Sequence, residues 1–316
     1  LDHFRHPKNM VIRIGTRGSK LALTQSELIK KEIERVHSNV QVELVRLKTT
    51  GDKILDSPLA KIGGKGLFVK EIEEALLNER VDLAVHSMKD VPAELPEGLI
   101  LATFPAREDP RDAFVSVKYG NLEQLPQGAR VGTGSLRRAA QLLHIRPDLK
   151  LVPLRGNVDT RLRKLEGGEF QAIILAAAGM RRLGFEERIS QLLSTEQILP
   201  AIGQGALGLE VRHDDEQTIG LIDFLNDEET QVTVKAERAF LKELEGGCQV
   251  PMAAFSRLDS ERLDLEGMVA ELDGSNVIRD RITGERDEAE DMGVRLARRL
   301  LASGADEILE RIYGEA

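Results

Sequence analysis

Short β-branched runs alternate with amphipathic segments through the N-terminal third of the chain, and this alternation constrains the fold more than any other feature. The strand-like runs are residues 11–16, 40–48 and 81–85, and the helix-like segments are residues 20–36 and 67–78. Such alternation is typical of βαβ units, in which the strands lie mainly parallel in one sheet. We therefore predict an α/β lobe at the N-terminus.

A second α/β lobe is predicted next, before the pattern changes to α+β. Strand-like runs at 112–117, 130–132 and 172–176 alternate with helix-like segments at 135–145 and 157–165. Beyond residue 230 the pattern predicts, in order, a helix to 244, strands at 253–258, 263–271 and 277–282, and a long C-terminal helix from about 287. We expect this last part to be a smaller α+β domain.

Two proline-containing stretches, residues 103–110 and 199–205, interrupt the α/β pattern and are interpreted as crossovers between the lobes. Residues 207–211 would then return to the first lobe as a strand, which is the layout of a two-lobed cleft protein. The predicted domains are residues 10–105 with 206–225, residues 110–200, and residues 228–316. Residues 1–9 precede the first strand and are interpreted as an added or processed leader.

Composition excludes several classes of protein. The 316 residues carry 44 Lys and Arg against 53 Asp and Glu, and 41% are hydrophobic, which is typical of a globular chain and excludes a disordered one. Only 3% are aromatic and none is Trp, so stacking platforms for nucleic acid are missing. The longest apolar stretch, residues 172–180, is less than half of the ~20 residues that a membrane span requires.

A single cysteine, Cys248, excludes an intrachain disulfide and a metal site built from several cysteines. We expect no metal, no nucleic-acid partner and no membrane partner, and we expect an intracellular chain in a reducing compartment. Cys248 follows two glycines and precedes Pro251, which favours an exposed loop thiol. A buried small hydrophobe is the commoner role of a free cysteine and remains an alternative; a catalytic pair of Cys248 with His86 is a weak one.

Arginines and hydroxyls cluster where glycine turns meet predicted helix starts. Residues 130–165 hold seven Arg and two Lys against two Asp and no Glu, a local charge of +7. Free backbone N–H groups and the helix dipole favour anions at such junctions, and each guanidinium can bind a carboxylate in a bidentate way. The residues concerned are Arg17 and Ser19, then Thr133, Ser135, Arg137 and Arg138, then Arg155 and Arg161.

Each of these residues also has a structural alternative. Ser135 is a good helix N-cap, which alone is worth about 1 kcal/mol, and any one arginine has about even odds of lying on a solvated helix face. The cap does not explain the paired Arg137 and Arg138. Three arginine-bearing junctions therefore indicate a ligand with many negative groups.

The segment from His86 to Asp90 follows an apolar strand, so its polar side chains should lie at the carboxyl end of the sheet, where α/β proteins bind ligands. In a cleft lined by cations Asp90 would stay ionised and stabilise a positive charge that develops on a substrate. The alternative is a surface ion pair with Lys89, worth at most about 1 kcal/mol.

Two glycine-rich motifs are read as packing and loop features. Residues 203–208 spell GxGxxG, but a proline-bearing turn precedes them and a strand follows, which is the wrong context for a dinucleotide site. Residues 63–66 lack the Walker Ser/Thr and are interpreted as a flexible loop that carries Lys65.

Taken together, these segments resemble the porphobilinogen deaminases. The resemblance covers nearly the whole chain from about residue 11, and its motifs are highly specific as an ordered set. They are RIGTRGSKLAL (13–23), TTGDKILDSPLAKIGGKGLFVKEIEEAL (49–76), VHSMKDVP (85–92), REDPRDAF (107–114), GTGSLRRAAQL (132–142), LRGNVDTRL (154–162), PAIGQGALG (200–208) and EGGCQVP (245–251).

The resemblance implies two lobes like those of periplasmic binding proteins plus a smaller domain that presents the cysteine. It implies an enzyme that joins four porphobilinogens head to tail, releases ammonia at each step and frees linear hydroxymethylbilane. The primer would be a dipyrromethane held as a thioether by Cys248. The chain would be a monomer of the cytoplasm, or of the plastid stroma in a photosynthetic eukaryote.

By the same resemblance, Asp90 would be the catalytic carboxylate, with Lys89 beside it. The acetate and propionate groups of the pyrroles would bind a line of polar and cationic residues: Arg17, Ser19, Lys65, Ser87, Lys89, Thr133, Ser135, Arg137, Arg138, Arg155, Arg161 and Arg182. Gly134 departs from the serine or alanine of many relatives, and we expect this difference only to tune cofactor contacts.

Two other functions remain open on sequence alone. A non-catalytic two-lobed protein that binds a polycarboxylate would share the lobes and the crossovers, and an unmodified Cys248 would favour it. A nicotinamide oxidoreductase rests on the GxGxxG motif alone, and failure to bind any dinucleotide would exclude it.

Overall fold

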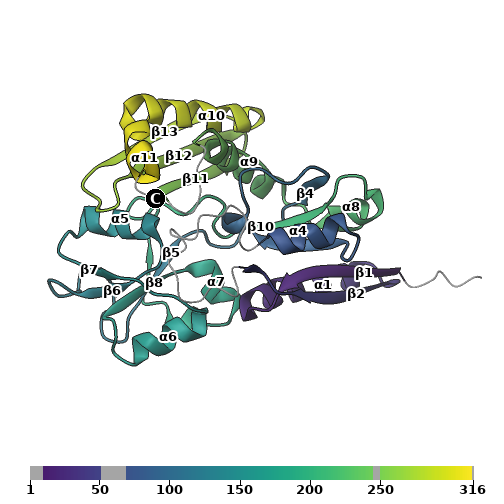
Figure 1. Ribbon diagram of the computed structural model, residues 1–316, viewed down its shortest axis with the longest axis horizontal. Coiled ribbons are helices and arrows are strands. Elements are labelled where there is room, and N and C mark those ends of the chain that lie inside the picture. Colours follow the sequence, from purple (N-terminus) through teal and green to yellow (C-terminus); the bar gives the residue numbers. More distant parts are fainter. Residues whose placement is uncertain (1–9, 51–68, 245–249, 315–316) are drawn as a thin grey trace, which may run out of the picture.

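The computed structural model describes residues 10–50, 69–244 and 250–314. Within these ranges the strands form two five-stranded sheets and one three-stranded sheet. Figure 1 shows the arrangement: the two larger sheets lie end to end, and the C-terminal domain lies above them. The predicted α/β class with a smaller α+β domain is confirmed.

The first lobe is built on a mixed sheet in which the first three strands are parallel and the crossover strand is antiparallel to its neighbours. In sheet order the strands are β2 (Val40–Leu47), β1 (Met10–Arg17), β3 (Leu83–Ser87), β10 (Leu207–Arg212) and β4 (Leu99–Thr103). The covering elements are α1 (Lys20–Val36), α4 (Lys70–Leu77), η1 (Met88–Asp90), α8 (Glu216–Ile222) and η3 (Asp223–Leu225).

The second lobe repeats this plan. In sheet order its strands are β7 (Lys150–Val152), β6 (Arg130–Gly132), β8 (Ala172–Ala176), β5 (Asp112–Val115) and β9 (Gln191–Leu193). Its helices are α5 (Leu136–Ile145), α6 (Val158–Glu166), α7 (Ala177–Arg182) and η2 (Glu186–Arg188). In both lobes the fourth strand, β10 or β5, follows a crossover and runs antiparallel to its neighbours. The predicted double crossover, with residues 207–211 returning to the first lobe, is therefore confirmed.

The two crossovers run side by side. The N–H of Glu108 donates to the carbonyl of Gly205 over 3.3 Å, and the Gln204 side chain donates to the carbonyl of Pro110 over 2.7 Å. Gly205 has φ +92°, and a Cβ there would lie 2.2 Å from the Glu108 carbonyl oxygen. The glycines of the GxGxxG motif therefore permit close packing of chain segments, and β10 follows them, as expected.

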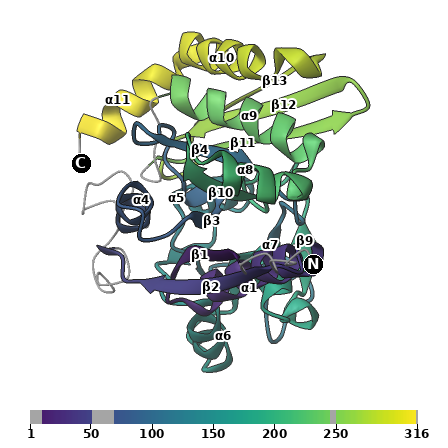
Figure 2. The ribbon, with the colours of Figure 1, turned by 90° about the vertical axis from the view of Figure 1, so that its right-hand side faces the viewer.

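The C-terminal domain packs its helices on a three-stranded antiparallel meander, which Figure 2 shows from the side. Its elements are α9 (Glu228–Glu243), β11 (Met252–Asp259), β12 (Arg262–Ala270), β13 (Val277–Glu285), η4 (Arg286–Glu288), α10 (Ala289–Leu300), η5 (Leu301–Ala305) and α11 (Asp306–Gly314). The predicted single C-terminal helix is wrong, because Gly304 adopts φ 101° and breaks it.

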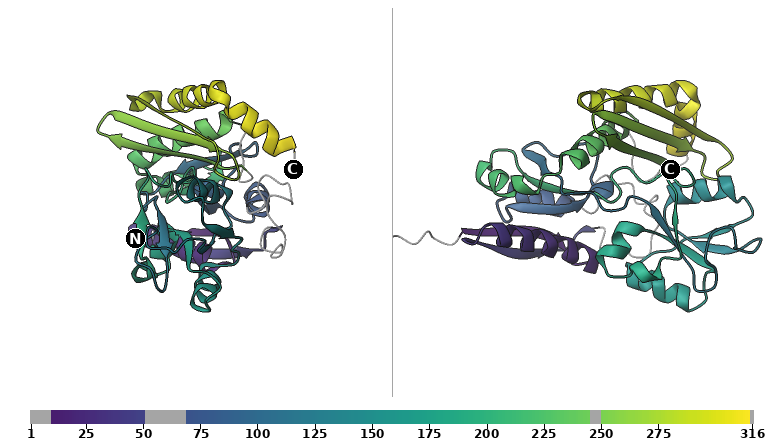
Figure 3. Two further views of the ribbon diagram at one scale, coloured as in Figure 1. Left: turned by 90° about the vertical axis from the view of Figure 1, so that its left-hand side faces the viewer. Right: turned by 180° about the vertical axis from the view of Figure 1, so that it is seen from behind.

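The C-terminal domain contacts both lobes (Figure 3). Towards the second lobe, its sheet residues Ala253 and Met268 share a buried cluster with Ala140 of α5. Towards the first, Arg238 of α9 donates to the carbonyl oxygens of Pro92 and Ala93 over 2.9 and 3.0 Å. This domain therefore holds the chain just beyond η1, although the exact domain limits remain a prediction.

Candidate functional site

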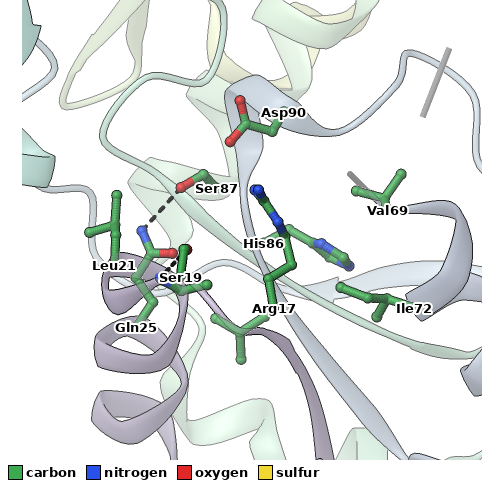
Figure 4. A pocket seen from close by; sticks show the side chains of 11 residues that line it. Arg17, Ser19, Leu21, Gln25, Val69, Ile72, His86, Ser87 and Asp90 are labelled. Carbon is green, nitrogen blue, oxygen red and sulfur yellow. Dashed lines mark hydrogen bonds between the residues drawn. The ribbon is translucent and has the colours of Figure 1, made fainter. Parts of the chain in front are cut away.

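A pocket lies at the carboxyl edge of the first lobe's sheet, where the sequence places Asp90. It is lined from β1, α1, the start of α4, β3 and η1. Figure 4 shows Asp90 at one rim, Leu21 and Gln25 of α1 on one side, and Val69 and Ile72 on the other, with Arg17 and His86 between them. The structure therefore brings Arg17, Ser19, Ser87 and Asp90 together around one pocket.

The start of α1 is fixed by its cap. The Ser19 hydroxyl accepts a bond from the N–H of Ala22 over 3.3 Å, which is the N-cap bond that satisfies a free donor at the helix start. One helical turn on, the buried Gln25 donates from Nε2 to the Ser87 hydroxyl over 3.0 Å, so α1 and the end of β3 are joined. The sequence reasoning missed Gln25, because its partner lies 62 positions away.

The segment that carries Asp90 is held from three directions. The N–H of Met88 donates to the carbonyl of Ala206 over 3.1 Å. The Met88 side chain fills the space over Gly208, where a Cβ would lie 2.2 Å from its sulfur. Since Arg238 binds the carbonyls just beyond η1, the position of Asp90 is set by the crossover and by the C-terminal domain together.

In the second lobe, Arg137 and Arg138 of α5 meet a buried carboxylate. Asp112 at the start of β5 is fully buried, and its oxygens accept bonds of 2.7 Å from both guanidinium groups. Burial alone would raise the pKa of Asp112, but the two arginines outweigh it and hold that pKa well below its usual range. Two cations on one carboxylate leave a net positive charge at this junction.

The Thr133–Ser135 turn closes against the loop after β7. The Ser135 hydroxyl caps α5 by accepting from the N–H of Arg138 over 3.4 Å, and the Thr133 hydroxyl accepts from the N–H of Ser135 over 3.2 Å. A Cβ on Gly134 would lie 2.8 Å from the carbonyl oxygen of Leu154. Glycine here allows a close backbone approach, so a serine at this position would require the turn to shift.

Four more predicted residues supply positive charge and form no close ion pair in the described part of the chain. Within residues 10–50, 69–244 and 250–314, Lys89, Arg155, Arg161 and Arg182 form no ion pair with a carboxylate. Arg161 donates to the carbonyl of Gly156 and Arg182 to that of Gly205, both over 2.7 Å.

The pKa values reflect this crowding of cations. Burial, helped by the nearby Arg138 and Arg155, lowers the pKa of Arg161 to about 10. Burial also lowers the pKa of Lys89; Asp90 opposes this effect, and Arg138 and Arg137 add to it. A site that holds like charges in partial burial favours a ligand with several carboxylates, which is what a dipyrromethane with its acetate and propionate groups would bring.

Two predicted site residues, Lys65 and Cys248, lie outside the described part of the chain. The predicted loop position of the thiol lies outside it too. Within the described part, no group of three or more His, Cys, Asp or Glu residues has an arrangement that could hold a metal ion. Nor does that part contain a helix with the length and apolar character of a membrane span.

The fold and the site define a class: a two-lobed α/β protein with a region rich in cationic side chains, a carboxylate in a pocket and a third domain. A family model described as "Porphobilinogen deaminase, dipyromethane cofactor binding domain" matches residues 12–220, and one described as "Porphobilinogen deaminase, C-terminal domain" matches residues 231–302. The chain belongs to the porphobilinogen deaminase family. It is therefore a transferase of tetrapyrrole biosynthesis with a dipyrromethane cofactor.

Two curated relatives are similar over nearly the whole chain. The porphobilinogen deaminase of Syntrophotalea carbinolica is 57% identical over 298 residues, covering 94% of this chain and 95% of the relative. That of Trichlorobacter lovleyi is 57% identical over 302 residues and covers 96% of each. Among solved structures, a methionine-binding lipoprotein of Bacillus subtilis matches 68% of this chain and 89% of its own, with TM-score 0.43 and 14% identity.

Proposed function

We propose that this chain is a hydroxymethylbilane synthase, which condenses four porphobilinogens head to tail and releases ammonia at each condensation. Membership of the family supports this activity. The observation that carries it is the placement of Asp90 in a pocket, together with several cations that form no close ion pair with a carboxylate among the described residues. That combination suits a substrate whose carboxylate groups bind to the cations while its pyrrole ring develops a positive charge.

The cofactor would be attached to Cys248 as a thioether. When bound, dipyrromethane supplies the free pyrrole α-carbon from which the chain is extended. Arg137, Arg138, Arg155 and Arg161 are proposed to bind its carboxylates. The residual positive charge of the Asp112 cluster and the like-charge crowding at Arg161 support this assignment.

Asp90 is proposed to stabilise the positive charge on ring nitrogen that develops when ammonia leaves and the next pyrrole attacks. A fixed carboxylate in a partly desolvated pocket stabilises such a charge more strongly than water does. Lys89, Arg17, Ser19, Ser87, Thr133, Ser135, Lys65 and Arg182 are proposed to bind and orient the acidic arms of substrate and product.

The partners we propose are small molecules alone, and the chain is proposed to act as a cytoplasmic monomer without nucleic-acid or membrane partners. Its negative net charge and scarcity of aromatic residues support this assignment.

Intact-protein mass spectrometry tests the cofactor. We expect a mass above that of the sequence by two pyrrole units, and we expect Cys248→Ser to lose the excess while Ser256→Ala keeps it. An unmodified and freely alkylatable Cys248 in freshly purified, folded protein would instead favour a non-catalytic polycarboxylate-binding protein.

The role of Asp90 is tested by Asp90→Ala and by Asp227→Ala, a control at the start of α9. Asp90→Ala should leave the protein folded but lower the rate of hydroxymethylbilane formation at least ~100-fold, because removal of a preorganised charge costs about that much. Turnover close to wild type would show that another carboxylate has this role.

A further inference from the structure

A buried acidic cluster lies behind the pocket, and the proposed reaction as described so far does not use it. The cluster comprises His86 on β3, Glu210 on β10 and Glu73 on α4, whose exposed fractions are 5%, 0% and 7%. His86 Nε2 lies 2.8 Å from Glu210 Oε2. Titratable groups are costly to bury, so three of them together beside a pocket indicate a functional use.

Strand register and helix packing bring the three side chains together. In the β3–β10 ladder Gly208 lies opposite His86 and Glu210 opposite Ala84, so His86 and Glu210 occupy the same face of the sheet. Helix α4 covers that face, since its Ala75 shares a buried cluster with Ala84. Glu73 on the same helix is buried and interacts electrostatically with Glu210 and His86.

Two carboxylate oxygens of this cluster are available to accept a proton or a hydrogen bond. Oε1 of Glu73 and Oε1 of Glu210 are both buried, and neither has a hydrogen-bond partner among the residues that the structure describes. Burial raises the pKa of Glu73 to about 7, the charge of Glu210 adds to this effect, and His86 opposes it. Glu73 therefore gains or loses its proton close to neutral pH.

His86 connects this cluster to the pocket. It lines the pocket with Arg17 and Asp90, as Figure 4 shows. Because Glu210 is bonded to Nε2, Nδ1 is the ring nitrogen left for the pocket. The charged groups around the cluster are Glu73 and Glu74 of α4, Glu210 of β10, Arg238 of α9, Arg17 of β1 and Asp90 of η1.

The proposed condensation needs a base in this pocket. Porphobilinogen carries an ammonium group, the carbon–nitrogen bond breaks and the nitrogen leaves as ammonia. A carbon–carbon bond then forms to a pyrrole α-carbon, whose C–H bond breaks to restore the aromatic ring. One proton per condensation must therefore be taken up. Asp90 is poorly suited to accept it, because a protonated carboxyl no longer stabilises the positive ring.

We propose that His86, supported by Glu210 and Glu73, is the base that takes up the proton released from the pyrrole α-carbon; this rests on the proposed function. The C–H electron pair stays with the ring while Nδ1 accepts the proton. Nε2 keeps its proton and its contact with Glu210 Oε2, whose charge stabilises the imidazolium, and the ammonia released in the same condensation takes the proton from Nδ1 and leaves as ammonium, which restores the base. No oxidant or further reactant is needed.

Nuclear magnetic resonance of the ¹⁵N-histidine-labelled holoprotein tests the coupling without any turnover. The His86 signals, assigned by their loss in His86→Gln, should change through a transition near the pH at which Glu73 ionises. That transition should disappear in Glu73→Gln and persist in Glu74→Gln, a matched exposed control on the same helix. Identical His86 titrations in all three proteins would overturn the proposal.

Kinetics test the proton transfer itself. His86→Ala should lower kcat about 10²- to 10⁴-fold, the usual contribution of a general base, with KM changed less than about threefold. Added imidazole should restore at least about tenfold, whereas His37→Ala, at the far end of α1, should match wild type. Mass spectrometry and thermal unfolding confirm in each variant that cofactor and fold are retained.

The outcomes separate the two proposals. A wild-type protein that makes no linear tetrapyrrole overturns the proposed function. If the wild type is active and His86→Ala keeps its rate, the role of His86 alone is overturned. The same conclusion follows if His86→Ala is folded and carries the cofactor but loses its rate and is not rescued by imidazole.

Discussion

The buried Asp112 determines how much of the bonding capacity of Arg137 and Arg138 is left for a ligand. Its carboxylate is enclosed and binds both Arg137 and Arg138, and Gln204 donates to it over 3.0 Å. Arginines at a helix start looked from the sequence like free anion-binding groups, yet each has part of its bonding capacity committed to this carboxylate. Ligand carboxylates at this junction would meet the remaining positive charge of a three-residue cluster.

Asp112→Asn should therefore destabilise the protein by about 3 to 5 kcal/mol, because removing one partner from a buried ion pair leaves charges uncompensated. Chemical denaturation measures this loss. Glu32→Gln is the control: Glu32 pairs with Arg35 on the surface of α1, and its loss should cost no more than about 1 kcal/mol. Equal effects of the two substitutions would contradict the buried network.

Glu73 predicts a specific dependence of stability on pH. Its pKa is raised from 4.5 to about 7 in the folded protein, so between these values the folded state holds a proton that the unfolded state has released. Stability from this group is therefore present at pH 4.5 and below and is lost as the pH rises to about 7, by on the order of 2 to 3 kcal/mol.

Glu73→Gln should remove that dependence, so the variant should lose less stability than wild type between pH 5 and pH 8. Denaturant unfolding at several pH values measures the difference, with Glu74→Gln as the exposed control. A variant that follows the wild-type curve would show that Glu73 ionises normally.

At the scale of elements, the joined crossovers depend on Gly205. An alanine there would place Cβ 2.2 Å from the Glu108 carbonyl oxygen and would adopt φ +92°. We expect Gly205→Ala to cost at least about 2 kcal/mol of unfolding free energy, from backbone strain plus displacement of the neighbouring segment. Gly18→Ala, whose Cβ would meet no heavy atom of the described residues within 4 Å, should be nearly neutral in the same denaturation assay.

Elements with a strong hydrophobic period were predictable from the sequence, whereas several short elements were missed. Residues 20–36 match α1 exactly, because an apolar stripe follows a capping Ser19. The strands β4, β7 and β9 were missed, since so few residues carry little pattern, although β6 and β8, which are equally short, were predicted at 130–132 and 172–176. Helix α7 was missed because it begins directly after β8 within one apolar run, and α8 because its seven residues are too few to show a helical period.

The candidate site divides in the same way. Asp90 and the glycine-flanked arginines were predictable because each lies in a local motif with its own chemistry. Asp112 and Gln204 were not, since only folding brings residues 92 positions apart into contact, and neither carries a local signal. Glu73 likewise acquires its raised pKa from burial and from Glu210, 137 positions further along the chain.

At the scale of the molecule, the lobes touch across their edges near the start of α1. Lys20 Nζ lies 3.8 Å from an Asp159 carboxylate oxygen and 5.3 Å from the centre of the Phe185 ring, and both partners belong to the second lobe. Leu21 lies against Gly179 of α7. These few contacts are the kind that lobes can make and break.

Lys20→Glu should favour a more open arrangement of the lobes, because it replaces attraction to Asp159 with repulsion and loses the cation–π contact. Small-angle X-ray scattering should show a larger radius of gyration than wild type, while thermal unfolding changes little. Lys31→Glu, on the same helix and away from the second lobe, is the control. An unchanged radius in Lys20→Glu would mean that other contacts hold the lobes.

The adjacent crossovers have a mechanical consequence. Because the two crossover segments are bonded to each other, they would form one hinge axis if the lobes rotated relative to each other. In such a rotation each atom moves in proportion to its distance from the hinge axis. Met88 packs against the glycines beside this hinge axis. The η1 segment that carries Asp90 would therefore move little, while the outer edges of the lobes would move further. Such a rotation would widen the space between the outer edges of the lobes for a lengthening product and would leave the position of Asp90 almost unchanged.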